Sequence, residues 1–183
     1  VNEDTTDPAG ATVSSLVSSS FDDSTDEVAG GSSADSFAGI AITGYTEDSA
    51  KGEWQFSTNG GTNWTAVSDG LTDNSALILA AADALRFVPA ADFNGTAPAL
   101  TVRLIEGDFT GFTSGGTADV SGDNNGGTTE VSDQTIALGT TITSVNDAPT
   151  LSGATISAAA DDVLADGGVS VGADASALLD NAN

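Results

Sequence analysis

Clusters of carboxylate and amide side chains, placed before and after apolar β-like segments, are the residues of this sequence best suited to chemistry. Aspartate, glutamate and asparagine offer hard oxygen ligands, and calcium binds about six to eight such oxygens. The candidate metal ligands are Glu3, Asp4, Asp7, Asp22, Asp23, Asp92, Glu106, Asp108, Asn146 and Asp147. Because alternate strand ends of a β-sandwich meet at one pole, acids there would converge and repel one another unless a cation joined them. We therefore predict bound Ca²⁺; the alternative is a set of solvated loop acids without a metal.

The overall charge narrows the classes of partner. Three basic residues stand against 27 acidic ones, which gives a formal net charge of −24. Such a chain is repelled by phosphate backbones and by anionic lipid surfaces, so neither nucleic acid nor a membrane is an expected partner. No apolar run approaches the roughly 20 residues of a membrane-spanning helix. The chain has no cysteine, so disulfides cannot brace it and another stabilising device is needed.

Catalysis is not expected from this composition. Histidine and cysteine are absent and Lys51 is the single lysine, so the usual general bases and thiol nucleophiles are missing. Two carboxylates at the right separation suffice for glycoside hydrolysis. Aspartate is so abundant here that such pairs carry little information, and we predict that the protein is not an enzyme.

Short apolar alternations separated by Gly, Asn, Asp and Ser predict an all-β fold. Expected strands cover residues 11–17, 36–42, 52–57, 63–67, 75–79, 84–88, 99–105 and 134–145. The sequence TNGG at 58–61, between the expected strands 52–57 and 63–67, is typical of a hairpin turn. Residues 80–85 are expected to form a single helical turn. The number of strands predicts a β-sandwich with long polar loops.

Residues 107–133 form a long polar segment between two expected strands. A structureless loop of this length is unusual in a compact domain. The segment is therefore open to four interpretations: a bulged hairpin, a ligand-binding loop, a metal-clamped excursion or a loose surface insert.

The end of the chain partly repeats its beginning at a shift of 158 positions. Asp161 and Asp162 fall on Glu3 and Asp4, and an apolar alternation follows each acid pair. This match predicts the start of a second copy and adds Asp161 and Asp162 to the candidate metal ligands. Residues 151–183 have too little apolar surface for a core of their own, so their strands need a sheet edge that belongs to another unit.

Four motifs in order resemble the long cadherin-like and immunoglobulin-like repeats of giant bacterial surface proteins, including the large RTX-type adhesins. These motifs are WQFSTNGGTNW (54–64), LRFVPAADFNGT (85–96), LTVRLIEGD (100–108) and TSVNDAPT (143–150). The resemblance implies an antiparallel Greek-key β-sandwich over residues 1–148, cadherin-like or immunoglobulin-like. Residues 149–183 would then be a linker and the start of the next repeat, or a strand-donating tail.

The same resemblance implies a function. Repeats of that family are calcium-braced units strung into extended fibres outside the cell. Asn146 and Asp147 would lend oxygens to an ion at the junction between units, where Glu3, Glu106 and Asp108 would also face. We expect a structural module at the bacterial cell surface, joined head to tail to neighbouring copies. The alternative is an adhesion domain that binds a sugar or a peptide through residues 107–133.

Overall fold

The computed structural model describes residues 1–26, 28–31 and 33–148, and the chain divides into two units, Val1–Asn146 and Asp147–Asn183. Two of the candidate metal ligands, Asp161 and Asp162, lie outside the described residues, and so does the whole of the expected tail 149–183. Fold, core and contacts below belong to the first unit.

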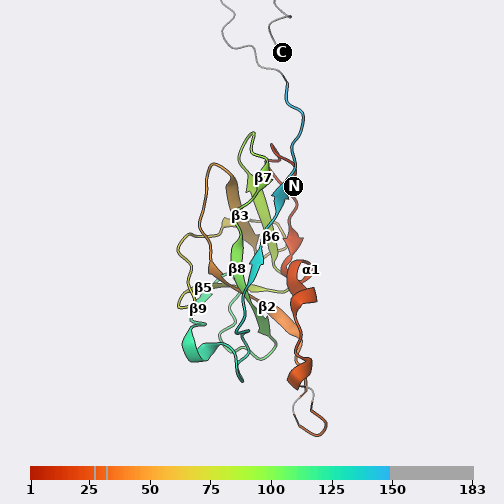
Figure 1. Ribbon diagram of the computed structural model, residues 1–183, viewed down its shortest axis with the longest axis vertical. Helices are drawn as coiled ribbons and strands as arrows, with labels where there is room; N and C mark the ends of the chain where they lie inside the picture. Colours follow the sequence, from red (N-terminus) through yellow and green to blue (C-terminus); the bar gives the residue numbers. More distant parts are fainter. Residues whose placement is uncertain (27, 32, 149–183) are drawn as a thin grey trace, which may run out of the picture. The chain divides into compact units, whose positions relative to one another are not determined.

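The first unit is mostly β-structure with one short α-helix among its described residues (Figure 1). The strands are β1 (Ala11–Thr12), β2 (Phe37–Gly44), β3 (Gly52–Ser57), β4 (Thr65–Ala66), β5 (Ala76–Ala80), β6 (Ala84–Pro89), β7 (Gly95–Thr96), β8 (Leu100–Glu106), β9 (Thr117–Ala118), β10 (Ile136–Leu138) and β11 (Thr141–Ile142). The helix is α1 (Val13–Val17), and three short 3-10 turns are η1 (Ser18–Ser20), η2 (Ser24–Asp26) and η3 (Gly122–Asn124). The all-β prediction is confirmed.

The strands form three antiparallel sheets. One has the order β1-β6-β3-β4, the second has the order β10-β8-β2-β5-β9, and β11 pairs with β7. The two larger sheets share one apolar core, to which Trp54 and Phe87 contribute from the first sheet, and Ile40, Leu79 and Leu100 from the second. The architecture is therefore sandwich-like, with each fully buried side chain of this kind contributing about 1.5–3 kcal/mol.

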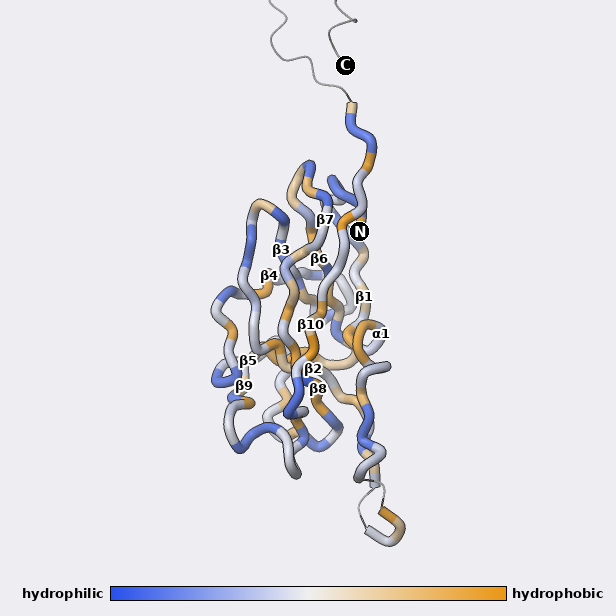
Figure 2. The backbone as a smooth tube through the Cα atoms, viewed as in Figure 1, coloured by the Kyte–Doolittle hydropathy of each residue, from blue (hydrophilic) through white to orange (hydrophobic). Residues whose placement is uncertain are grey.

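The five-stranded sheet is buried on both faces. Ala41, Ile78 and Ile105 point away from the main core and form a second apolar cluster with Val120 and Val131. Phe109, Phe112 and Ala118 pack against this cluster, so its outer half comes entirely from residues 107–133. Figure 2 shows apolar residues along the strands and polar residues in many of the loops between them.

A close approach at Gly39 shows how tightly the segment packs on this sheet. A Cβ atom at Gly39 would lie 2.2 Å from the carbonyl oxygen of Leu79 and 2.9 Å from the ring of Phe112. The interpretation of 107–133 as a loose surface insert is therefore wrong.

Three strand predictions are wrong in part, and of the expected strand 63–67 only β4 (Thr65–Ala66) forms. Residues 13–17 of the expected strand 11–17 form α1, in which Val13 and Val17 are buried one helical turn apart and Thr12 accepts a hydrogen bond from Ser15 N at 3.3 Å. The expected strand 134–145 is broken at Gly139–Thr140, because β10 pairs with β8 whereas β11 pairs with β7.

The helical turn expected at 80–85 is a tight turn between two strands. β5 extends to Ala80 and β6 begins at Ala84, and Asp83 N donates to Ala80 O at 3.0 Å. The buried Asp83 carboxylate in turn accepts from Ala80 N at 2.6 Å, which closes the turn from the other side. The strand predicted at 52–57 is confirmed with the same bounds as β3.

Candidate metal centre

The first residues of the chain lie beside the last residues of the first unit. Glu3 N donates to Thr143 O at 3.0 Å and Thr143 N donates to Val1 O at 2.8 Å, while Asn2 and Thr143 form a parallel bridge. Two segments about 140 positions apart in the sequence therefore run side by side. This pairing brings Glu3 and Asp4 to the end of the unit where Asn146 lies.

Glu3 is a buried carboxylate with a defined partner for each oxygen. Its side chain is in a residue only 4% exposed. Oε2 accepts from Asn94 Nδ2 at 3.0 Å and Oε1 accepts from Val145 N at 2.5 Å. Glu3 thus joins three segments: the chain start, the loop between β6 and β7, and the strand end after β11. A buried carboxylate needs such donors, because desolvation of an unpaired charge is costly.

Asp4 and Asp92 approach each other beside the hydrogen bonds of Glu3. We call this region of the unit the acidic end; it consists of Glu3, Asp4, Asp92, Asn94 and Val145. One carboxylate oxygen of Asp4 and one of Asp92 lie within 4.8 Å of each other, and both residues are exposed. Asp92 N also donates to Asp4 Oδ1 at 3.1 Å. Two oxygens that each lie about 2.4 Å from one calcium ion are at most about 4.8 Å apart, so the pair has the spacing of calcium ligands.

The backbone at both aspartates is in the left-handed region. Asp4 has φ 62° and Asp92 has φ 58°, and no other non-glycine residue of the described chain has a positive φ. This conformation costs an L-residue about 1–2 kcal/mol, although aspartate tolerates it better than most. The fold therefore holds two like charges together in strained backbone.

The candidates Asp22, Asp23 and Glu106 lie elsewhere. With Glu130 and Asp133 they line a hollow of about 400 Å³. Asp22 accepts from Ser24 N at 3.0 Å, and hydrogen bonds from Ser24 hold the pKa of its carboxyl below the usual value. Asp23 accepts from Asp35 N at 2.6 Å.

The expectation that Glu106 and Asp108 face the same junction as Asn146 and Asp147 is wrong. Leu138 is paired with Leu100 and Ile136 with Val102, so β10 runs antiparallel to β8. The chain therefore moves away from Glu106 as it continues from β10 toward Asn146. Glu106 ends β8 opposite Phe37, and Asp108 follows it, at the other end of the unit.

Asp7 has a cationic partner. Its carboxylate forms an ion pair with Arg86 Nη1, whose guanidinium lies 4.1 Å from the ring centroid of Trp64. Arg86 Nε also donates to Gln55 Oε1 at 2.8 Å. Asn146 is exposed, and Asp147 is the first residue of the second unit.

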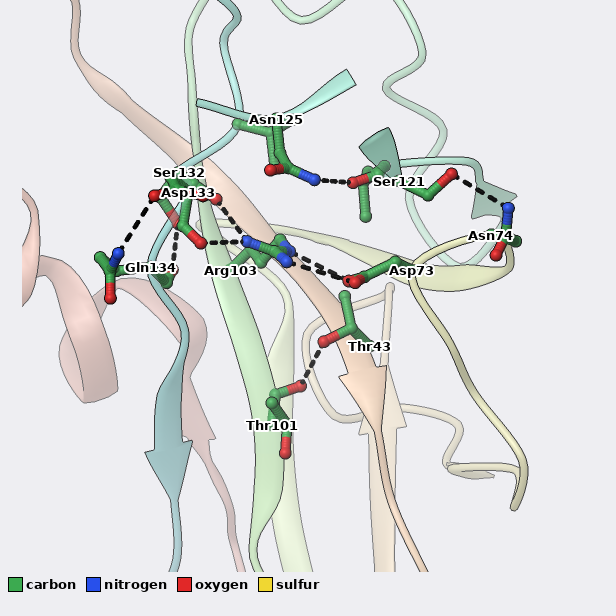
Figure 3. Close-up of polar contacts among 12 residues, drawn as sticks. Thr43, Asp73, Asn74, Thr101, Arg103, Ser121, Asn125, Ser132, Asp133 and Gln134 are labelled. Carbon is green, nitrogen blue, oxygen red and sulfur yellow. Dashed lines mark hydrogen bonds and ion pairs between the residues drawn. The ribbon is translucent and has the colours of Figure 1, made fainter. Parts of the chain in front are cut away.

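A cluster that the sequence did not predict surrounds Arg103 of β8. This residue is only 9% exposed, and its guanidinium contacts Asp73 twice, with Nε to Oδ1 at 3.0 Å and Nη2 to Oδ2 at 3.2 Å. Nη1 donates to Ser132 O at 2.9 Å and to Asp133 O (Figure 3). We call these four residues the arginine clamp, because they fasten the end of segment 107–133 to the sheet.

Each of the three basic side chains of the protein forms an ion pair with an aspartate. Lys51 Nζ lies 3.3 Å from Asp48 Oδ2, and Arg86 and Arg103 contact Asp7 and Asp73. The carboxylates of the acidic end therefore meet without an ion pair to any Lys or Arg.

Further polar contacts tie segment 107–133 to the sheets. Ser114 Oγ donates to the buried Asp83 carboxylate. Asn74 Nδ2 donates to Ser121 Oγ at 3.0 Å, a contact drawn in Figure 3. Inside the segment, hydrogen bonds from Ser121 lower the pKa of the exposed Asp119 carboxyl. The segment is thus held at several points along its length.

The large aromatic residues do not form an open platform. Trp54 is buried, and its indole Nε1 donates to Pro98 O at 2.7 Å. Tyr45 is buried beside it, where its hydroxyl accepts from Trp54 N at 3.4 Å and burial raises the pKa of its phenol. Trp64 is half-buried under Arg86. Trp54 is therefore a core residue.

No known family model matches this chain, and no curated protein or solved structure matches it either. The cadherin-like resemblance therefore stays a prediction. Over residues 1–26, 28–31 and 33–148, no helix is both long and apolar enough to cross a membrane.

Proposed function

We propose that this protein is a structural, calcium-stabilised unit of an extracellular bacterial fibre or adhesin, joined head to tail to neighbouring units and without catalytic activity. The observation that carries the proposal is the meeting of Asp4 and Asp92 within 4.8 Å, in strained backbone, at the end of the unit where the chain continues. Two exposed like charges repel each other, and a divalent cation turns that repulsion into attraction.

Asp147 is the proposed third ligand at this end. Glu3 fixes Val145 N, and Asp147 follows two positions later, so its backbone is tethered within about 7 Å of a fixed point. Asn146 contributes its amide oxygen, and Pro149 restricts the linker that follows. The hollow with Asp22, Asp23 and Glu106 is the proposed cation-binding surface of the opposite end, where Asp108 also lies, facing a different neighbour.

The finer fold assignment belongs to the same proposal. Successive strands alternate between the two larger sheets: β2 is in one, β3 and β4 are in the other, β5 is in the first and β6 in the second. Such alternation is typical of antiparallel Greek-key sandwiches of the cadherin-like and immunoglobulin-like type.

Thermal melting with and without calcium tests the proposal. A ligand that binds only the native state adds about 2.7 kcal/mol at a hundredfold excess over its Kd. Melting is compared in chelator, in millimolar calcium, and in NaCl of the same ionic strength. We expect calcium to raise the melting temperature well above both controls. Equal melting temperatures in all three solutions would leave a salt-adapted acidic surface as the better account.

The junction is tested separately with two units joined in tandem through residues 143–150. We expect Asp147→Ala to shorten the maximum dimension measured by small-angle scattering in calcium while leaving the melting of each unit nearly unchanged. An unaltered maximum dimension would remove Asp147 from the ligand set.

A second candidate function is adhesion through residues 107–133, and one observation favours it. Phe109, Asp119, Asp123 and Glu130 border a hollow of about 340 Å³, which combines an aromatic side chain with polar groups as ligand pockets do. A glycan and peptide array comparing the wild type with Phe109→Ala tests this idea. Binding that the variant loses would support it, and an array without any retained ligand would eliminate it.

A further inference from the structure

A groove on one side of the first unit differs in charge from the rest of the molecule. This edge groove, of about 280 Å³, has Trp54, Leu85, Phe87 and Leu138 among its lining residues. No carboxylate lines it, and its one charged side chain is Arg86. In a chain of net charge −24, a carboxylate-free apolar surface is a place that another acidic chain can approach without strong repulsion.

The groove is bordered by the edges of both larger sheets. β1 is the terminal strand of one sheet and β10 is the terminal strand of the other. Both are short: β1 covers β6 only at Ala84 and Leu85, and β10 has three residues. Edge strands offer backbone donors and acceptors to an incoming strand, while the pockets between sheets accept its alternate side chains.

We propose that the edge groove binds residues 153–158 of a second copy of this chain as an added strand. This inference rests on the head-to-tail assembly proposed above and names the contact that would hold it. Residues 151–160, LSGATISAAA, carry no charged side chain. In an extended conformation Ala154, Ile156 and Ala158 share one face, so one large and two small apolar side chains would enter the groove.

The absence of cysteine allows a direct test by disulfide cross-linking. One full-length copy carries Ala9→Cys at the groove lining, and a differently tagged copy carries Ala158→Cys. After mild oxidation of the mixture we expect a disulfide between the two copies. Ser157→Cys points to the opposite face of the strand, and Val28→Cys lies outside the groove lining, so each control pair should cross-link at least fivefold less.

Equal yields for the control pairs, or no cross-link with Ala9→Cys, would overturn the proposal. A chain that carries both Ala9→Cys and Ala158→Cys gives the remaining outcome. If its disulfide forms only within one chain at low concentration and mixed copies never cross-link, the groove holds the chain's own tail and the intermolecular assignment is wrong.

A charge placed in the groove provides an independent test. Leu16 lines the groove and is 37% exposed, so Leu16→Asp adds a carboxylate there with little effect on folding. Val28, 56% exposed and outside the lining, gives the matched variant Val28→Asp. We expect sedimentation to show at least tenfold weaker association for Leu16→Asp and wild-type association for Val28→Asp, with unchanged melting of both. Equal association of the two variants would contradict strand docking.

The same samples separate this proposal from the metal proposal. Apolar docking does not use the acidic end, so the cross-link is expected to form in chelator as well as in calcium. If calcium raises the melting temperature but the cross-link does not form, the groove proposal is wrong and the metal proposal stands. If the cross-link forms but calcium leaves the melting temperature unchanged, the metal proposal is wrong and the groove proposal stands.

Discussion

The arginine clamp and the acidic end differ in how the negative charge of their carboxylates is compensated. At the clamp, the buried Arg103 neutralises Asp73 and donates to two backbone carbonyls, so this polar cluster is complete within the chain. At the acidic end, Asp4 and Asp92 approach each other with no basic side chain as a partner. The charge of Asp73 is compensated within the chain at the arginine clamp, whereas the charges of Asp4 and Asp92 are not compensated by any basic side chain.

The difference follows from how few cations the sequence contains. Three basic side chains cannot balance 27 acids, and each of the three already forms an ion pair with one aspartate. Buried positions need internal compensation because water cannot reach them, whereas exposed carboxylates can be screened by ions from solution. Calcium dependence is therefore expected at the exposed cluster and not at the clamp.

Removal of the buried cation should give the largest effect. Arg103→Met removes the charged hydrogen bonds to the carbonyls of Ser132 and Asp133 and leaves Asp73, whose side chain is 39% exposed, without its partner, so we expect a loss of about 3 kcal/mol in the free energy of unfolding. The exposed pair Lys51–Asp48 supplies the control, because Lys51→Met should cost no more than about 1 kcal/mol. Urea unfolding at neutral pH measures both, and equal losses would show that the contacts of the buried Arg103 do not form in solution.

A change under segment 107–133 should give the next largest effect. Gly39→Ala places a methyl group against Leu79 O, which is a fixed part of the sheet, so we expect a loss of about 2–3 kcal/mol. At Gly107 the nearest atoms to an added Cβ lie 3.8 Å away, and Gly107→Ala should be nearly neutral. If Gly39→Ala unfolds at the same urea concentration as Gly107→Ala, the packing of Phe112 on the sheet is wrong.

Asp92→Gly should change the sign of its effect with calcium. In chelator it removes both a repelled charge and the left-handed strain, so we expect a gain of about 1 kcal/mol, while Asp92 N–H remains available to Asp4. In calcium the variant should lose the stabilisation of the wild type. Asp92→Asn keeps the tolerated backbone type and separates the charge effect from the strain. Identical stability changes in the two solutions would argue against a cation at the acidic end.

The smallest expected effect is a pH dependence in segment 107–133. Hydrogen bonds from Ser121 lower the pKa of Asp119 in the folded state below its usual value of 3.8. The folded state therefore binds this proton less readily than the unfolded state, and the contribution is present above pH 4 and disappears as the pH falls below it. Stability measured from pH 5 to pH 2 should fall less steeply for Asp119→Asn than for the wild type. An unchanged slope would show that this turn is not formed in solution.

Local sequence patterns predicted most of the longer strands, but they could not predict contacts between residues far apart in the sequence. β3, GEWQFS, alternates apolar and polar residues over six positions, and β6, ALRFVP, is an apolar run interrupted only by Arg86, so both segments indicate a strand. The sequence VSSLV fits a strand and a helix equally, and the capping by Thr12 together with the burial of Val13 and Val17 decides for the helix.

The site was predicted by residue type more than by position. Asp4 and Asp92 were chosen as strand-end acids, but nothing in the sequence shows that they meet, because 88 positions separate them. Arg103 looked like one residue of a regular strand, and its partners Asp73 and Ser132 lie about 30 positions away on either side. Phe109, Phe112 and Val120 have no helical or strand period, so the covering role of 107–133 has no local signal.

The parallel contact between Val1–Glu3 and Thr141–Val145 has a mechanical consequence. A force that pulls Val1 one way and Val145 the other acts along these two segments. The bonds Glu3 N to Thr143 O, Thr143 N to Val1 O and Val145 N to Glu3 Oε1 would then be sheared together instead of opening one after another. A seam loaded in this geometry ruptures at higher tension than a hairpin peeled from one end, so the same contact that gathers the acids would also set the tensile strength of the unit.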